Sequence, residues 1–156
     1  MSHMAILKSR SRDLDALARA AAKCGGELVR DQKTHAWWGI SVGDYNAENS
    51  ALRNGVSRDQ LGTCDHAIRL KGLPGENGQN GPWEVGVVDR PEGFALIYDN
   101  YYTAGKQLES AFGVEMKTLL NHFAAEVAMA ELSMDGFNVT GSHVDANGNV
   151  FVEMED

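Results

Sequence analysis

Two short apolar runs joined by a turn sequence predict a central β-hairpin. Residues 83–89 and 94–98 have the composition of strands, and the Arg-Pro-Glu-Gly sequence of residues 90–93 is typical of a tight turn. A three-residue loop closed by Gly93 predicts three cross-strand pairs: Arg90 with Phe94, Val88 with Leu96, and Gly86 with Tyr98. Both faces of this hairpin carry apolar residues, so we expect it to lie centrally in a sheet, with the Tyr98 ring over Gly86.

Apolar residues spaced by three and four positions predict two helices. The first is capped by Ser11 or Asp13 and ends at Gly25, with its apolar stripe at Leu14, Leu17, Ala18 and Ala21. The second is longer; Gly113 interrupts it and residues 135–136 end it. Its apolar positions are Leu108, Phe112, Met116, Leu119, Phe123, Val127 and Ala130.

The remaining apolar runs predict further strands on both sides of the central hairpin. They lie at residues 1–8, 27–30, 36–42, 64–70, 137–144 and 150–154. The last two form a closing hairpin around the Asn147-Gly148 turn signal. Residues 43–63 are expected to be irregular, with one short helix at 58–61, and the glycine-rich residues 72–81 are expected to form a mobile hairpin loop.

This order of elements predicts the fold class. Strands, a helix, a run of strands, a second helix and a closing hairpin indicate a single α+β domain over residues 1–156. We expect an antiparallel or mixed sheet of six to eight strands, with two helices packed on one face and a ferredoxin-like character.

Charge and cysteine content narrow the function classes. The formal net charge of -8 opposes non-specific binding to nucleic acid or to an anionic membrane, and it suits a basic partner. No apolar run approaches the length of a membrane helix, and the N-terminus does not read as a signal peptide. We therefore expect a cytoplasmic protein in which Cys24 and Cys64 are reduced thiols, although one long-range disulfide is an alternative.

Four stretches together resemble a known family. They are Met1-Ser-His, Cys64-Asp-His-Ala-Ile-Arg69, the segment from Trp83 to Asn100, and the segment from Asp135 to Val152. The chain resembles the chloroplast open-reading-frame thirty-five family, which occurs in plastids and cyanobacteria, with members in other bacteria and in phages, and is a domain of unknown function. Members often carry a Trp-Trp or Phe-Trp pair where this chain has Tyr101-Tyr102. The resemblance implies a fold and no established activity.

The chemically reactive side chains do not converge on a catalytic pattern. Cys64 and His66 share a face of a predicted strand, and Asp65 points to the other, so a nucleophilic thiol is the less favoured interpretation. His122 and Glu126 lie one helical turn apart, which predicts a solvated helix face and not a metal pair. We therefore expect no catalytic residue, no metal and no cofactor.

The aromatic residues suggest a binding surface instead. Neighbouring aromatic residues on one strand point to opposite faces, so one of Trp37 and Trp38, and one of Tyr101 and Tyr102, should face outward. The alternative is that other segments cover both faces of the sheet. The candidate binding residues are Trp37, Trp38, Tyr45, His66, Trp83, Tyr101 and Tyr102.

Three functions remain open at this point. The first is a non-enzymatic interaction module that binds a protein partner or a second copy through an aromatic sheet face or edge. The second is a binder of a small ligand, such as a nucleotide, that stacks on the aromatic rings. The third is a hydrolase or transferase that uses Cys64 or His66.

Overall fold

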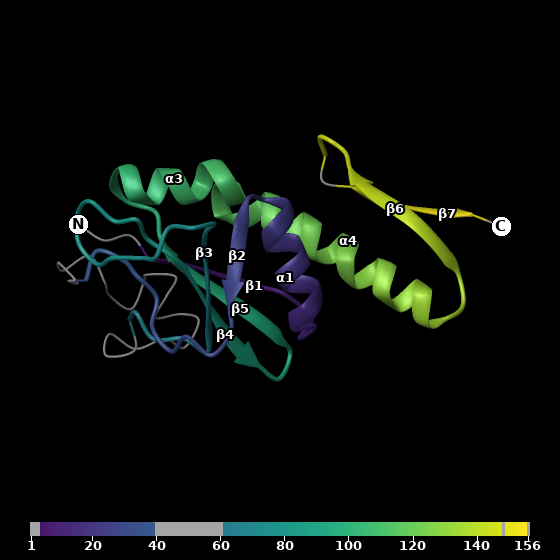
Figure 1. Ribbon diagram of the computed structural model, residues 1–156, viewed down its shortest axis with the longest axis horizontal. Helices are drawn as coiled ribbons and strands as arrows, with labels where there is room; N and C mark the ends of the chain where they lie inside the picture. Colours follow the sequence, from purple (N-terminus) through teal and green to yellow (C-terminus); the bar gives the residue numbers. More distant parts are fainter. Residues whose placement is uncertain (1–3, 40–60, 148, 156) are drawn as a thin grey trace.

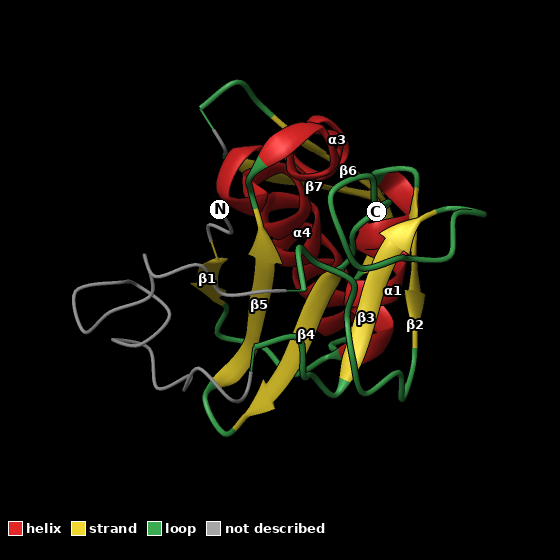
Figure 2. Ribbon diagram, turned by 90° about the vertical axis from the view of Figure 1, so that its left-hand side faces the viewer, coloured by secondary structure: helices red, strands yellow, loops and turns green. Residues whose placement is uncertain are grey.

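Five strands form the main sheet. The computed structural model describes residues 4–39, 61–147 and 149–155. All neighbouring strands run antiparallel, in the order β1-β5-β4-β3-β2 (Figure 2). The strands are β1 (Met4–Lys8), β2 (Gly26–Val29), β3 (His66–Leu70), β4 (Val85–Arg90) and β5 (Gly93–Asp99). Because β1 and β2 lie at opposite edges, the helical connection between them crosses the whole width of the sheet.

Helices cover one face of this sheet (Figure 2). They are α1 (Leu14–Lys23), α3 (Tyr102–Phe112), the short 3₁₀ helix η2 (Val114–Met116) and α4 (Lys117–Met134). The predicted boundaries are confirmed: Asp13 accepts a hydrogen bond from the amide of Ala16, and Gly113 breaks the second helix at a φ of 89°. No helix in the described part of the chain is long and apolar enough to span a bilayer.

The main hydrophobic core lies between the sheet and these helices. The inward side chains of the three central strands pack against the apolar stripes of α1, α3 and α4. Its largest fully buried members are Trp83, Tyr98, Phe112, Leu17, Ile68, Leu96, Leu108, Met116 and Leu119. Burial of this apolar surface is the main contribution to folding.

The closing hairpin is separate from the main sheet. Strands β6 (Asn138–Val144) and β7 (Val150–Glu155) pair only with each other and pack on α4, away from the five-stranded sheet (Figure 1). The α+β class is therefore confirmed, but the seven strands form two sheets and not the single sheet that we expected. The ferredoxin-like character is not confirmed, because the main sheet is a meander from β2 to β5 to which β1 adds at the edge.

The register predicted for the central hairpin is wrong by one residue. Arg90 pairs with Gly93, Val88 with Ala95 and Gly86 with Ile97, so the loop contains only Pro91 and Glu92. Gly93 ends the turn as a paired strand residue with a φ of 147°, and its position against the backbone of Ser9 leaves no room for a side chain. The Tyr98 ring consequently faces the helices, and another ring covers Gly86.

The strand predicted at residues 36–42 is also wrong over its described part. Residues 36–39 form no strand; just before them, Thr34 makes an isolated β-bridge with Thr63. The segment instead lies across the second face of the sheet, and its apolar side chains pack downward onto that face. The irregular segment and short helix predicted at 43–63 fall mostly outside the described residues.

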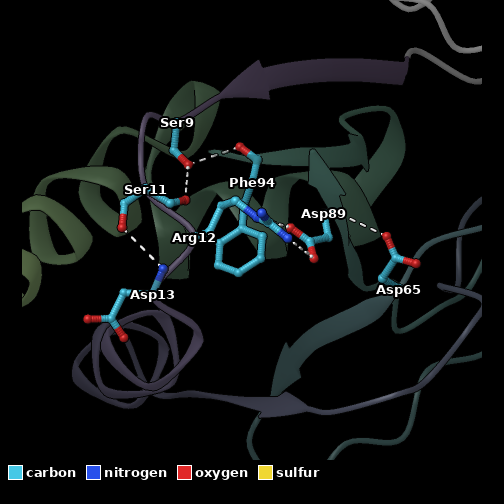
Figure 3. A network of polar contacts seen from close by, with 7 residues as sticks. All are labelled: Ser9, Ser11, Arg12, Asp13, Asp65, Asp89 and Phe94. Atoms are coloured by element: carbon cyan, nitrogen blue, oxygen red, sulfur yellow. Dashed lines mark hydrogen bonds and ion pairs between the residues drawn. The ribbon is translucent and has the colours of Figure 1, made fainter. Parts of the chain in front are cut away.

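Polar contacts connect the start of α1 to the far end of the central hairpin (Figure 3). The Arg12 guanidinium binds both carboxylate oxygens of Asp89, at 2.7 and 3.0 Å. The Asp89 amide donates to the carboxylate of Asp65, and the Ser9 hydroxyl donates to the carbonyl oxygen of Phe94. All these charged groups are at least partly exposed, so the network adds little to the stability of the fold. Its main effect is to position the connection between β1 and α1 against the central hairpin.

Glu126 joins α4 to α1, where we expected a solvated helix face. Its carboxylate is 5% exposed and accepts hydrogen bonds from Arg19 Nε at 2.8 Å and Lys23 Nζ at 2.6 Å. Burial alone would raise the pKa of Glu126, but the hydrogen bonds from Lys23 and Arg19 outweigh it and lower this pKa below its usual value. His122 lines a different part of the surface, together with Lys117, Asn121 and Asp145.

We predict that Glu126→Gln lowers the free energy of unfolding by about 2 kcal/mol, because two charge-assisted hydrogen bonds to a buried carboxylate are lost. Urea unfolding measures the change. The matched control is Glu131→Gln, an exposed position on the same helix, which should change stability by less than about 0.5 kcal/mol. Equal effects of the two substitutions would contradict a stabilising role for the buried ion pair.

Candidate functional site

The second face of the sheet has an apolar half and a polar half. Over β1 and β5, the side chains of Met4, Ile6, Ala95 and Ile97 form a small cluster with Trp37. Over β2, β3 and the residue before β4, charged side chains follow one another instead. Glu27 pairs with Arg69 in the sheet register, and the next strand brings Glu84 to the same row. The polar half is therefore part of the sheet itself.

Two non-regular segments cover this face and are bonded to each other. Residues 31–39 run over the sheet, and the glycine-rich loop between β3 and β4 lies beside them. The Trp37 amide donates to Asn77 Oδ1 at 3.0 Å, and the Gly78 amide donates to the Trp37 carbonyl at 2.9 Å. The Trp83 indole donates to the Gly78 carbonyl at 2.6 Å. The glycine-rich residues thus form the predicted connection between β3 and β4. The hydrogen bonds at Asn77 and Gly78 hold this connection against Trp37 and Trp83.

A buried histidine lies at the centre of this arrangement. His35 is 2% exposed, and its ring packs against Gly86 of β4, where an added Cβ would meet His35 Cδ2 at 2.5 Å. Neither ring nitrogen has a hydrogen-bond partner of good geometry. Burial lowers the pKa of His35 to about 4, and the nearby backbone of Glu84 and Ala36 offsets this only in part. The ring is therefore neutral at physiological pH.

Glu84 is the second buried polar side chain. It is 3% exposed, and its Oε1 accepts hydrogen bonds from Gln32 Nε2 at 2.8 Å and from the Ala36 amide at 3.0 Å. Both donors are neutral, and among the described residues no cationic group pairs with this carboxylate. Arg69, its neighbour across the sheet, binds Glu27 Oε1 through Nε at 2.7 Å. A buried carboxylate without a counter-charge is unusual, because desolvation of a lone charge is costly.

A cavity of about 320 Å³ opens beside these groups. Its walls include Gln32, His35, Arg69, Asn77 and Glu84, together with the backbone of the glycine-rich loop at Gly75. Gly75 lies so close to the Glu84 carboxylate that a side chain there would collide with it. The arrangement offers hydrogen-bond acceptors, donors and one guanidinium to a small polar ligand.

The predicted aromatic group is brought together only in part. Trp38 stacks on Tyr102 at 5.3 Å between ring centroids and meets Trp83 edge-on at 6.4 Å, and Tyr101 lies 4.4 Å from Tyr102. Trp37 lies apart in the apolar cluster of the second face, and Tyr45 falls outside the described residues. Of the aromatic rings in this group, only Tyr102 is exposed, so most of the cluster is structural packing.

The thiol and imidazole of residues 64–66 do not form a nucleophilic pair. Cys64 Sγ donates to the carbonyl of Gln32, and burial raises the pKa of this thiol to about 12. His66 Nδ1 accepts a hydrogen bond from the Asp31 amide at 2.9 Å. A protonated, hydrogen-bonded thiol is a poor nucleophile, so the geometry does not support the thiol chemistry considered above. Both cysteines are free.

Sequence reasoning missed His35, Glu84 and Gln32. One signal was available: Glu84 is a lone carboxylate in an otherwise apolar run, next to the strand glycine Gly86. His35 and Gln32 carry no local signal, because their burial depends on where residues 31–39 lie. Among the described residues, no group of three or more histidine, cysteine or acidic side chains is placed to hold a metal ion.

Comparison with protein-family models, with curated proteins and with solved structures found no match. The resemblance to the chloroplast open-reading-frame thirty-five family therefore stays a prediction.

We predict that the free energy of unfolding decreases as the pH is lowered from neutral toward the pKa of the buried His35 ring. In the unfolded chain its pKa is the ordinary 6.5, and in the folded protein it is about 4. The unfolded state therefore binds more protons between these values, so stability is full above the higher value and decreases below it. Between about pH 7.5 and about pH 5, we expect a loss of about 2 kcal/mol.

Urea unfolding across this range measures the loss, and NMR of the histidine rings should show a neutral His35 at about pH 5. Carboxylates with lowered pKa values, such as Glu126 and Asp89, lose their contribution only at lower pH. A free energy of unfolding that stays constant over the range would show that His35 is not buried in its neutral form.

Proposed function

We propose that this protein is an interaction module that binds another protein through the exposed apolar side chains of its C-terminal hairpin and of the end of α4. The observation that carries the proposal is the concentration of exposed apolar side chains at this end of the molecule. Met134 is 87% exposed, Phe137 53%, Phe151 47% and Met154 51%. All four lie within residues 134–154, and large exposed apolar side chains concentrated in one part of a protein are typical of binding sites.

The hairpin has one face against the body of the protein and one face toward solvent. The valines at 139, 144, 150 and 152 are partly buried on the side that packs on α4. On the opposite side Phe151 stacks on His143, with 4.9 Å between the ring centroids. An isolated two-stranded hairpin is only marginally stable in water, so a partner that covers its open face would add to its stability.

The edges of the hairpin are less suited to binding than its face. A register shift between Val139 and Gly141 disturbs the ladder of β6, and β7 carries Glu153 and Glu155. Bulges and charges of this kind are known to keep a free strand edge from pairing with another chain. These features favour docking of side chains on the face over addition of a strand.

The charges around the apolar residues favour a basic partner over a second copy. Glu131, Asp135, Glu153 and Glu155 are exposed and lie on the same C-terminal elements. Two copies would bring these carboxylates together, and the whole chain has a net charge of -8. A partner with an apolar centre and a basic rim complements this surface.

We predict that the double substitution Phe137→Ser, Phe151→Ser abolishes partner binding and leaves the fold intact, because both side chains are already exposed. Affinity capture from cells with the wild-type chain as bait measures this. The matched control is Val114→Ser, an apolar residue that is 62% exposed but lies far from the hairpin in the sequence. We expect the wild type and Val114→Ser to capture the same proteins and the double variant to capture none of them. High salt should release the captured proteins.

The same proteins on all three baits, or none on any, would contradict the proposal. Light scattering at increasing concentration tests self-association. A dimer that the double substitution dissociates would assign the surface to a second copy instead of a basic partner.

A further inference from the structure

The cavity beside Glu84 is a second site, independent of the C-terminal hairpin. Its floor includes Arg69 of β3 and Glu84, the residue that precedes β4. Its walls are residues 32–36 and the glycine-rich loop, which the hydrogen bonds of Trp37 with Asn77 and Gly78 hold together. The volume of about 320 Å³ is that of a small-molecule site.

The groups around the cavity keep unused hydrogen-bonding capacity. Both hydrogen bonds to the Glu84 carboxylate go to Oε1, which leaves Oε2 available to a donor. Arg69 uses only Nε on Glu27, which leaves its terminal amino groups available to an acceptor. His35, 2% exposed, offers one donor and one acceptor in its neutral form, and both nitrogens lack partners. Buried polar groups without partners are rare in folded proteins and call for an explanation.

The charges of these groups select among ligands. A phosphate or another simple anion would meet the buried Glu84 carboxylate, which opposes it. A metal ion would lack ligands, because the described residues bring no third acidic, histidine or cysteine side chain to this carboxylate. A ligand with a cationic donor at one end and an anionic acceptor at the other would compensate Glu84 and engage Arg69 at once.

We propose that this cavity binds a small zwitterion of the amino-acid class, with its ammonium group on Glu84 and its carboxylate on Arg69. Arg69 follows Ile68 and Glu84 precedes Val85, the last pair in the register of β3 with β4, so the two side chains line the same cavity and one ligand can reach both. The guanidinium suits a carboxylate because its planar donors match both oxygens. Asn77 faces the ligand's side chain, which must be short to fit the cavity, and the buried His35 lies in the wall behind it.

Isothermal titration calorimetry on the full chain tests the proposal with defined probes. Glycine, L-alanine and L-serine represent the zwitterion, ethanolamine the ammonium group alone, and acetate the carboxylate alone. We expect at least one amino acid to bind, and ethanolamine and acetate to bind at least about tenfold more weakly, since each engages one charged group only.

Two substitutions assign the contacts. Glu84→Gln keeps the shape and the acceptor for the Ala36 amide but removes the charge, and Arg69→Gln removes the guanidinium. Each should weaken amino-acid binding at least about tenfold. The control Glu153→Gln, on the exposed hairpin, should leave binding unchanged. Circular dichroism and thermal unfolding establish that each variant is folded before binding is measured.

A second measurement needs no substitution. In the NMR spectrum of the histidine rings, the His35 signals should move when the amino acid is added, whereas those of His143 on the hairpin should not. Failure of all three amino acids to bind the wild-type chain would overturn the proposal. So would ethanolamine or acetate binding as tightly as the amino acids, or undiminished binding to Glu84→Gln.

Discussion

The contact between the His35 ring and the backbone of Gly86 determines how the second face of the sheet is covered. Gly86 is the second residue of β4, the middle strand of the main sheet, and the absence of a side chain there leaves room for the imidazole ring of His35 against the strand. With His35 in that place, the residues that follow it are brought onto the sheet: Ala36 reaches Glu84, and Trp37 reaches the apolar cluster over β5. A side chain at position 86 would lift this whole segment.

The two faces of the sheet are covered by different means, and this difference produces the polar site. Helices satisfy their own backbone groups, so the first face could be made almost wholly apolar. A non-regular segment cannot do this, and its amides need acceptors from elsewhere. Here Glu84 and Asn77 accept the amides of Ala36 and Trp37. A non-regular segment that covers a sheet therefore requires buried polar side chains. The hydrogen-bonding positions that these side chains leave unused are available to a ligand.

Local rules predicted the parts of the fold that local residues decide. Asp13 as a helix cap, Gly113 as the helix break and the end of α4 at Asp135-Gly136 follow from the chemistry of single residues. The register of the central hairpin failed because Gly93 can either close a three-residue loop or end a two-residue one, and the backbone of Ser9, far away in the sequence, favours the second. The strand expected near Trp37 failed because its apolar side chains pack on the sheet from above and are not paired within it.

The polar site could not be predicted in this way. The hydrogen bond between Gln32 and Glu84 joins residues 52 positions apart, and the carboxylate becomes buried only once the segment around His35 is in place. In the sequence, Gln32 resembles an ordinary surface position, and Glu84 differs from one only as a lone carboxylate in an apolar run. The packing of the aromatic residues could not be predicted for a related reason: Trp38 contacts Trp83 and Tyr102 only once the segment around His35 is in place, which periodicity does not reveal.

The substitution Gly86→Ala tests the central contact most directly, because the added methyl group would lie 2.5 Å from His35 Cδ2. Overpacking should lower the free energy of unfolding by about 2 kcal/mol. This loss is larger than the stabilisation that alanine brings by reducing the conformational entropy of the unfolded chain. The His35 ring signals should shift at the same time. Gly141→Ala, where the nearest atom would be 3.8 Å away, is the control and should be close to neutral. Unchanged stability and unchanged His35 signals in Gly86→Ala would show that this ring does not lie on the strand, and the account of the second face would be wrong.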